Sequence, residues 1–132
     1  MKIRYGYVSN SSSTSYTVYF KENDSVKMTN GKTSFELSVN DFFDGIIERG
    51  SNYDGDSTRV MAKGIENARE FFKEEAKWND GTSLKMFEDF LAKKKGDGNV
   101  AVIDISYHDE LAKKLFDFLT VVGLFEVIET AD

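Results

Sequence analysis

This chain of 132 residues lacks, or nearly lacks, several residue types on which specialised sites depend. It contains no cysteine, which excludes disulfides and cysteine-ligated metal sites and leaves the redox compartment open. It contains no proline, so no turn or helix end relies on a fixed φ angle. The single histidine, His108, argues against histidine-rich zinc sites and most acid–base triads.

Long apolar segments are missing as well. No apolar run approaches the ~20 residues that a membrane-spanning helix needs. The opening segment, MKIRYGYVSN, has no apolar stretch of the signal-peptide type. We therefore expect a cytoplasmic protein without a membrane partner.

The residues that are present are typical of a globular protein. Hydrophobic residues make up 40% of the chain and charged residues 30%, and eleven phenylalanines predict a Phe-rich core. The length fits one domain, residues 1–132. The net charge of −6 argues against direct nucleic-acid binding through phosphate neutralisation. It fits an ordinary acidic protein, or one that docks on a basic surface and could imitate DNA.

The segment Asn99–Tyr107, NVAVIDISY, is the one around which the predicted fold is organised. Its near-continuous apolar residues are typical of a strand buried on both faces. An amphipathic helix at 109–122 and the apolar run Leu124–Ile128 follow it, which together predict a βαβ unit. We expect an α+β (or α/β) domain. Its mixed sheet would combine this unit with an amino-terminal antiparallel part, and about four helices would pack on it.

Antiparallel pairing is expected in two places nearer the amino terminus. Residue alternation predicts strands at Ile3–Val8 and Tyr16–Phe20, joined by a long serine-rich connection. The dipeptide Asn30-Gly31 favours a two-residue type I′ turn and predicts a hairpin over 26–37. The predicted register pairs Met28 with Thr33 and Val26 with Phe35, so that apolar side chains share a face.

Apolar residues at helical spacing predict four helices, at 39–49, 58–78, 84–95 and 109–122. Ser38 and Ser83 are the expected caps of the first and third. The expected stripe of the last helix consists of Leu111, Leu115, Phe118 and Leu119. Trp78, at the end of the longest helix, would be either a lid on the core or an exposed anchor.

The amino terminus carries an unusual motif. It resembles the signature M-K-x-R-x-G-(F/Y)-V-S-N-S-S-S-x-S-(F/Y) of small, mostly uncharacterised proteins from tailed bacteriophages and mobile elements. The matching residues are Met1, Lys2, Arg4, Gly6, Tyr7, Val8, Ser9, Asn10, Ser11, Ser12, Ser13, Ser15 and Tyr16. Thr14 stands where serine is commoner, which keeps the hydroxyl. The resemblance implies a phage or mobile-element origin and, with it, a location in an infected bacterium. It implies no reaction and no cofactor.

The serine-rich connection is itself a candidate site. Its hydroxyls and one carboxamide could cradle an anion or accept a covalent modification. The alternative is that they only satisfy the backbone of an irregular turn. The candidate residues are Ser9, Asn10, Ser11, Ser12, Ser13 and Ser15.

Two acidic groups are weaker candidates. Asp54 and Asp56 resemble the D-x-D-x-T motif of haloacid-dehalogenase phosphatases and the opening of a calcium loop, but no apolar strand precedes them, and Ile65 stands where a calcium loop has glutamate. A solvated loop that caps the next helix is the main alternative. Asp104 and His108, at the end of the central strand, could act in proton transfer or metal binding. A buried Asp104 should be paired or lie near an edge, because an unpaired charge is costly.

Three functions remain open at this point. The leading hypothesis is a non-enzymatic phage accessory protein that binds a bacterial host or defence protein, in one version through an acidic surface. The first alternative is a small enzyme or sensor that takes a phosphorylated or nucleotide-like ligand at the serine loop. The second is a structural component of a virion. No oligomeric state is predicted.

Overall fold

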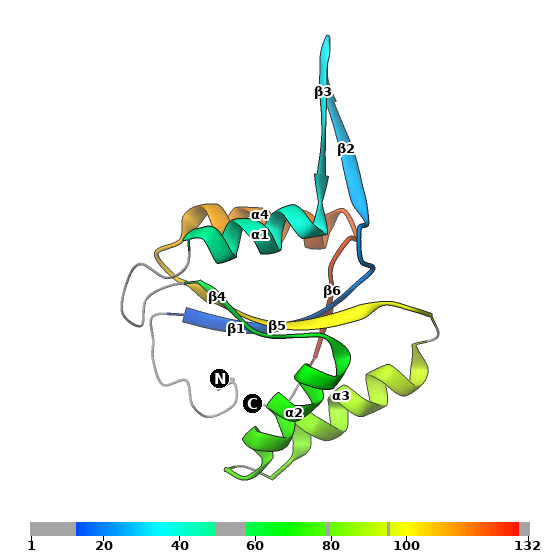
Figure 1. Ribbon diagram of the computed structural model, residues 1–132, viewed down its shortest axis with the longest axis vertical. Coiled ribbons are helices and arrows are strands. Elements are labelled where there is room, and N and C mark those ends of the chain that lie inside the picture. Colours follow the sequence, from blue (N-terminus) through cyan, green and yellow to red (C-terminus); the bar gives the residue numbers. More distant parts are fainter. Residues whose placement is uncertain (1–12, 50–57, 79, 95, 130–132) are drawn as a thin grey trace.

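The protein has a mixed α+β fold, as predicted, in which a four-stranded sheet lies between two pairs of helices (Figure 1). The structure is a computed structural model and describes residues 13–49, 58–78, 80–94 and 96–129. The strand predicted at Ile3–Val8 lies outside these residues.

The main sheet has four strands, and a pair of helices packs on each of its faces. In the four-stranded sheet the order is β4 (Arg59–Lys63), β5 (Asn99–Ser106), β1 (Ser13–Phe20) and β6 (Glu126–Ile128). One face is covered by α1 (Val39–Arg49) and α4 (Glu110–Val121), the other by α2 (Ile65–Ala76) and α3 (Thr82–Lys93) (Figure 1). A separate hairpin of β2 (Ser25–Asn30) and β3 (Thr33–Ser38) projects away from these layers.

The central strand β5 confirms the organising prediction. It lies inside the sheet, with β4 on one side and β1 on the other, and it is buried from Val100 to Ser106. Ala101, Ile103 and Ile105 join the core under α1 and α4, whereas the alternate residues Val100 and Val102 join the core under α2 and α3. Since successive side chains of a strand point to opposite faces, both faces of β5 must be apolar.

The predicted βαβ unit is present in a split form. Both β5 and β6 pair antiparallel with β1, so they run parallel to each other with β1 between them. Every strand pair in the described residues is therefore antiparallel. Helix α4 makes the connection from β5 to β6, and its N-cap Asp109 accepts a hydrogen bond from Ala112 N–H.

The helix predicted at 58–78 is wrong in its first part. Residues Arg59–Lys63 form β4, and the helix begins only at Ile65. Gly64 separates the two with a φ angle of 108°, and its N–H donates to the carbonyl of Val100. The strand forms because β5 would otherwise have an unpaired buried edge, and backbone groups in such a place need hydrogen bonds. Trp78, which follows the C-cap of α2, is 86% exposed and is therefore not a core lid.

The hairpin has the predicted apolar face but a different register. Asn30 pairs with Thr33, so Gly31 and Lys32 form the turn, and Met28 faces Phe35 rather than Thr33. Gly31 has a φ of 64° and Lys32 does not have a positive φ, which is the pattern of a type II′ turn. The shift moves each partner by two residues. It therefore preserves the faces, and Val26, Met28, Phe35 and Leu37 still share one side.

The remaining helix boundaries are close to those predicted. Ser38 and Asp41 form a reciprocal capping pair at the start of α1. Helix α3 begins at Thr82 with Gly81 as its N-cap, so the prediction of Ser83 as the cap is wrong. The N–H and hydroxyl of Thr82 both donate to Asp80 and lower the pKa of that carboxyl. Leu111 of α4 is 58% exposed, so its predicted place in the buried stripe is wrong. Among the described residues, no helix has the length and apolar character required to span a membrane.

Candidate functional site

Two of the predicted site residues, Ser15 and Asp104, meet on neighbouring strands. Ser15 of β1 and Asp104 of β5 are paired in register, and both are buried. The Ser15 hydroxyl donates a hydrogen bond of 3.1 Å to Oδ1 of Asp104. The structure thus brings the last serine of the serine-rich segment to the carboxylate of the central strand.

A third strand adds a cation to this pair. Arg59 of β4 is in register with Asp104, and its Nε lies 3.8 Å from Oδ2 of the carboxylate. The Asp104 side chain is 10% exposed and the Arg59 side chain 57%. The carboxylate is therefore buried, whereas the arginine beside it is accessible to solvent. Asp104 is therefore paired, as its burial required. Sequence reasoning missed Arg59 because it placed the residue in a helix.

Two further hydroxyls lie at the same end of β5. Ser106 N–H donates to the Thr58 hydroxyl at 3.0 Å, and His108 N–H donates to the Ser106 hydroxyl at 3.2 Å. Thr58 and Ser106 are buried, and His108 is exposed. We call the group formed by Ser15, Thr58, Arg59, Asp104 and Ser106 the polar end of the sheet.

Among the described contacts, no hydrogen bond or ion pair joins the predicted proton-transfer residues Asp104 and His108. The described contacts of Asp104 are with Ser15 and Arg59, and the described hydrogen bond of His108 comes from its backbone. The carboxylate accepts one hydroxyl and is balanced by one guanidinium, an arrangement that joins three strands. The exposed guanidinium of Arg59 is the group in this cluster best suited to hold an anion.

Other predicted site residues lie beyond what the structure describes. These are Ser9, Asn10, Ser11, Ser12, Asp54 and Asp56. Ser13 is described as part of β1, with its backbone opposite Ser106. Within the described ranges, no group of three or more His, Cys, Asp or Glu side chains could hold a metal ion.

The hairpin presents a second candidate surface, which sequence reasoning treated only as a fold element. Its apolar face consists of Val26 and Leu37 near the base and Met28 and Phe35 farther out. Leu37 packs against the core, whereas Phe35 is 58% exposed. The opposite face carries the polar pairs Lys27–Glu36 and Thr29–Ser34. We call the outer part of the apolar side, the half-buried Met28 and the exposed Phe35, the hairpin face.

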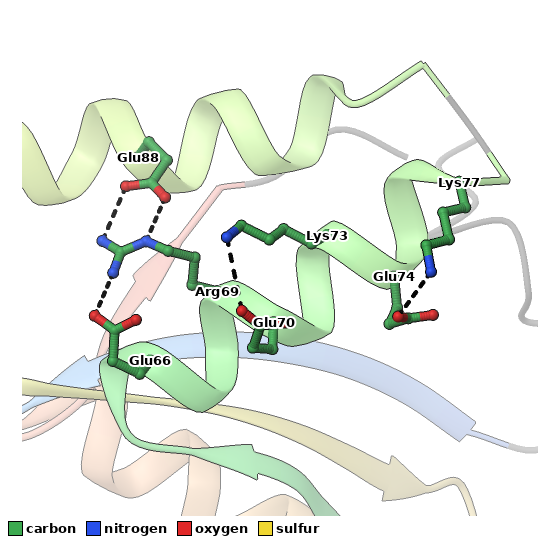
Figure 2. Close-up of polar contacts among 7 residues, drawn as sticks. All are labelled: Glu66, Arg69, Glu70, Lys73, Glu74, Lys77 and Glu88. Carbon is green, nitrogen blue, oxygen red and sulfur yellow. Dashed lines mark hydrogen bonds and ion pairs between the residues drawn. The ribbon is translucent and has the colours of Figure 1, made fainter.

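The acidic residues of α2 do not form a uniformly acidic face. Figure 2 shows each of Glu66, Glu70 and Glu74 beside a basic residue three positions later on the same helix. Arg69 also makes a bidentate contact with Glu88 of α3, with Nε 2.5 Å and Nη2 3.1 Å from the two carboxylate oxygens. The Arg69 hydrogen bonds hold the pKa of Glu88 below its ordinary value of 4.5. The seven side chains drawn in Figure 2 carry four negative and three positive charges, so most of the negative charge of this surface is balanced locally.

Two surface recesses lie away from the polar end of the sheet. One, of about 380 Å³, lies between α3 and β6 and includes Met86, Phe90 and Val127 in its lining. The other, of about 430 Å³, is lined by Tyr19, Lys94 and Glu126 among others. Neither of these two recesses includes Ser15 or Asp104, so they add nothing to the predicted site.

No protein-family model, curated protein or solved structure matches this chain.

Proposed function

We propose that this protein is a phage or mobile-element accessory protein that binds a protein of its bacterial host and catalyses no reaction. The observation that carries the proposal is the hairpin face. A sheet that is apolar on one side normally packs that side on another layer, yet Phe35 is more than half exposed. The amino-terminal resemblance supplies the phage or mobile-element origin.

The chemistry of the hairpin suits protein recognition. An aromatic side chain is a common anchor in protein interfaces because it removes a large apolar area from water with few rotamers to fix. Phe35 has Met28 as its cross-strand neighbour, and Met adapts its shape to irregular partners. The polar pair Thr29–Ser34 on the opposite side would remain in water.

The test is a comparison of the two sides of the same hairpin. Tagged full-length protein and its Phe35→Asp and Ser34→Asp variants are exposed to bacterial lysate, and captured proteins are quantified by mass spectrometry. We expect a partner that the unmodified protein and Ser34→Asp retain and Phe35→Asp loses. If every captured protein binds all three forms equally, the proposal is wrong.

An acidic surface would add a salt-dependent contribution to the same binding. Raising the ionic strength from about 0.1 to about 1 M shortens the Debye length from about 10 to about 3 Å. Capture that falls steeply over this range would indicate that the net charge of −6 assists binding. Capture that does not change would assign the binding to the hairpin face alone.

A second candidate is a binding site for a phosphorylated ligand at the polar end of the sheet. The contact of the Ser15 hydroxyl with Asp104 supports it, as does the exposed guanidinium of Arg59. Inorganic phosphate and adenine nucleotides are the probes, and thermal denaturation is the readout. A stabilisation by either probe that Arg59→Gln abolishes would favour this function over host-protein binding. No stabilisation at millimolar concentrations of either probe would remove this candidate.

A further inference from the structure

We infer that β3 is an association edge, along which two copies of this chain pair their hairpins antiparallel into a four-stranded intermolecular sheet. The starting observation is that, within the part of the chain that the structure describes, β2 and β3 form a sheet of two strands. An isolated two-stranded hairpin is marginally stable in water and needs further strands or packing against another element. Here Leu37, near the base, packs against the core, whereas Phe35 farther out is exposed. A second hairpin supplies the missing strands.

The edges of this hairpin have few of the usual protections against association. Natural edge strands are protected by proline, bulges, inward-pointing charges or very short length. This chain has no proline, and the six pairs of β2 and β3 run without a register shift. By contrast, β6, an edge of the main sheet, has only three residues. The two edges of the hairpin are therefore the better templates for pairing.

The two edges differ in how their charges are placed. The β2 edge carries Lys27, and lysine is a common protecting residue at sheet edges. The β3 edge carries Glu36, but its carboxylate accepts a hydrogen bond of 2.7 Å from the hydroxyl of Ser25 on β2. This contact turns the Glu36 charge across the hairpin, away from the outer side of β3. The β3 edge is therefore the less protected one.

The backbone of β3 fixes which groups face outward. In a hairpin closed by a two-residue turn, the closing pair Asn30–Thr33 is hydrogen-bonded, and hydrogen-bonded pairs then alternate along the ladder. Phe35 thus uses its backbone groups inside the hairpin, and Ser34 and Glu36 direct theirs outward. Ser38 lies two residues after Glu36, so the alternation predicts that its N–H also points away from β2. That N–H donates to Asp41, in agreement with this prediction.

An antiparallel register centred on Phe35 is compatible with both the backbone and the charges. With Phe35 opposite Phe35 of the second copy, Ser34 lies opposite Glu36 and the outward groups of both form hydrogen-bonded pairs. No like charges then face each other directly, whereas centring the pairing on Glu36 would oppose two carboxylates. The hairpin faces of the two copies form one continuous row across the four strands, Met28–Phe35–Phe35–Met28. The Phe35 side chains become close cross-strand neighbours.

The test is the mass of the purified full-length protein in solution as a function of concentration. Sedimentation equilibrium should show the mass rising from 15.0 kDa toward twice that value, with a dissociation constant on the order of 10–100 μM, because an interface of one strand pair is small. A mass that stays at 15.0 kDa up to millimolar concentration overturns the inference.

Two proline variants locate the edge. Ser34→Pro removes an outward N–H of β3, and Thr29→Pro removes an outward N–H of β2, so both leave the hydrogen bonds inside the hairpin intact. We expect Ser34→Pro to weaken dimerisation at least tenfold and Thr29→Pro to change it less than threefold, with unchanged far-ultraviolet circular dichroism. The opposite pattern, or equal loss in both, overturns the assignment to β3.

This association needs no host protein, so it is tested separately from the proposed function. If the dimer fails while Phe35→Asp still loses a captured partner, only the pairing of β3 is wrong. If the dimer forms and no partner depends on Phe35, the proposed function fails and the association edge remains.

Discussion

The central strand β5 and the hairpin β2–β3 use apolar residues in different patterns, and the difference shows where the fold is complete. Both alternate positions of β5 are apolar because helices cover both of its faces. In the hairpin only alternate positions are apolar, a pattern typical of a strand with one covered face. The main sheet has its cover within the chain, whereas much of the hairpin face remains exposed. The hairpin is therefore where a partner molecule would contribute most.

The largest expected effect is in the main sheet. Ile103→Ala removes a side chain with no exposed area from the core under α1 and α4. The lost apolar burial and the remaining cavity should lower the free energy of unfolding by about 3 kcal/mol. Urea denaturation at neutral pH measures the change. A loss below about 1 kcal/mol would mean that β5 is not the centre of the core.

A glycine at the start of β5 tests how closely the sheet is packed. A Cβ built on Gly98 would lie 2.2 Å from Cζ of Tyr19, a residue whose hydroxyl accepts the Gly98 N–H. Gly98→Ala should therefore lower the free energy of unfolding by about 1–3 kcal/mol through overpacking. Gly45→Ala is the matched control, because nothing lies within 4 Å of its Cβ position in α1. The control should be neutral or stabilise by up to about 1 kcal/mol. Equal losses in the two variants would contradict the close approach.

A smaller effect is expected on the other side of the sheet, at the contact between α2 and α3. The pKa of Glu88 is lowered in the folded state, so its contribution to stability is present above the ordinary value of 4.5. That contribution is lost as the pH falls through the lowered value. Because the Glu88 side chain is 40% exposed, solvent screening limits the coupling with Arg69 to about 0.5–1 kcal/mol at pH 7.

A double-mutant cycle of Arg69→Met and Glu88→Gln measures this coupling at pH 7 and pH 3. We expect it to be smaller at pH 3. A coupling of the same size at both values would show that the ionised carboxylate is not what stabilises the pair.

The smallest effect on stability is expected in the hairpin. Phe35→Ala should change the free energy of unfolding of the monomer by less than about 0.5 kcal/mol, because the side chain is 58% exposed. The same change should weaken association or partner capture clearly. A loss of stability comparable to that of Ile103→Ala would mean that the hairpin face is part of the core and would remove the contrast between the two regions.

The polar end of the sheet shows a limit of reasoning from local pattern. The expectation that Asp104 is paired follows from its place in an apolar strand, and the structure gives it Ser15 and Arg59 as partners. That Arg59 is one of these partners could not be predicted, because residues 59–63 lack the alternation of apolar and polar residues that indicates a strand. Only their pairing with β5 makes them a strand.

The sequence by itself determined the elements whose signal lies within a few neighbouring residues. These are the doubly buried β5, the amphipathic α1 and α4, and the apolar face of the hairpin. Tertiary structure alone decided that β1 enters between β5 and β6, that β4 is a strand, and that Ser15, Arg59 and Asp104 meet. The physical reason is that periodicity reports which face of an element is buried, whereas strand order depends on hydrogen bonds between segments far apart in the chain.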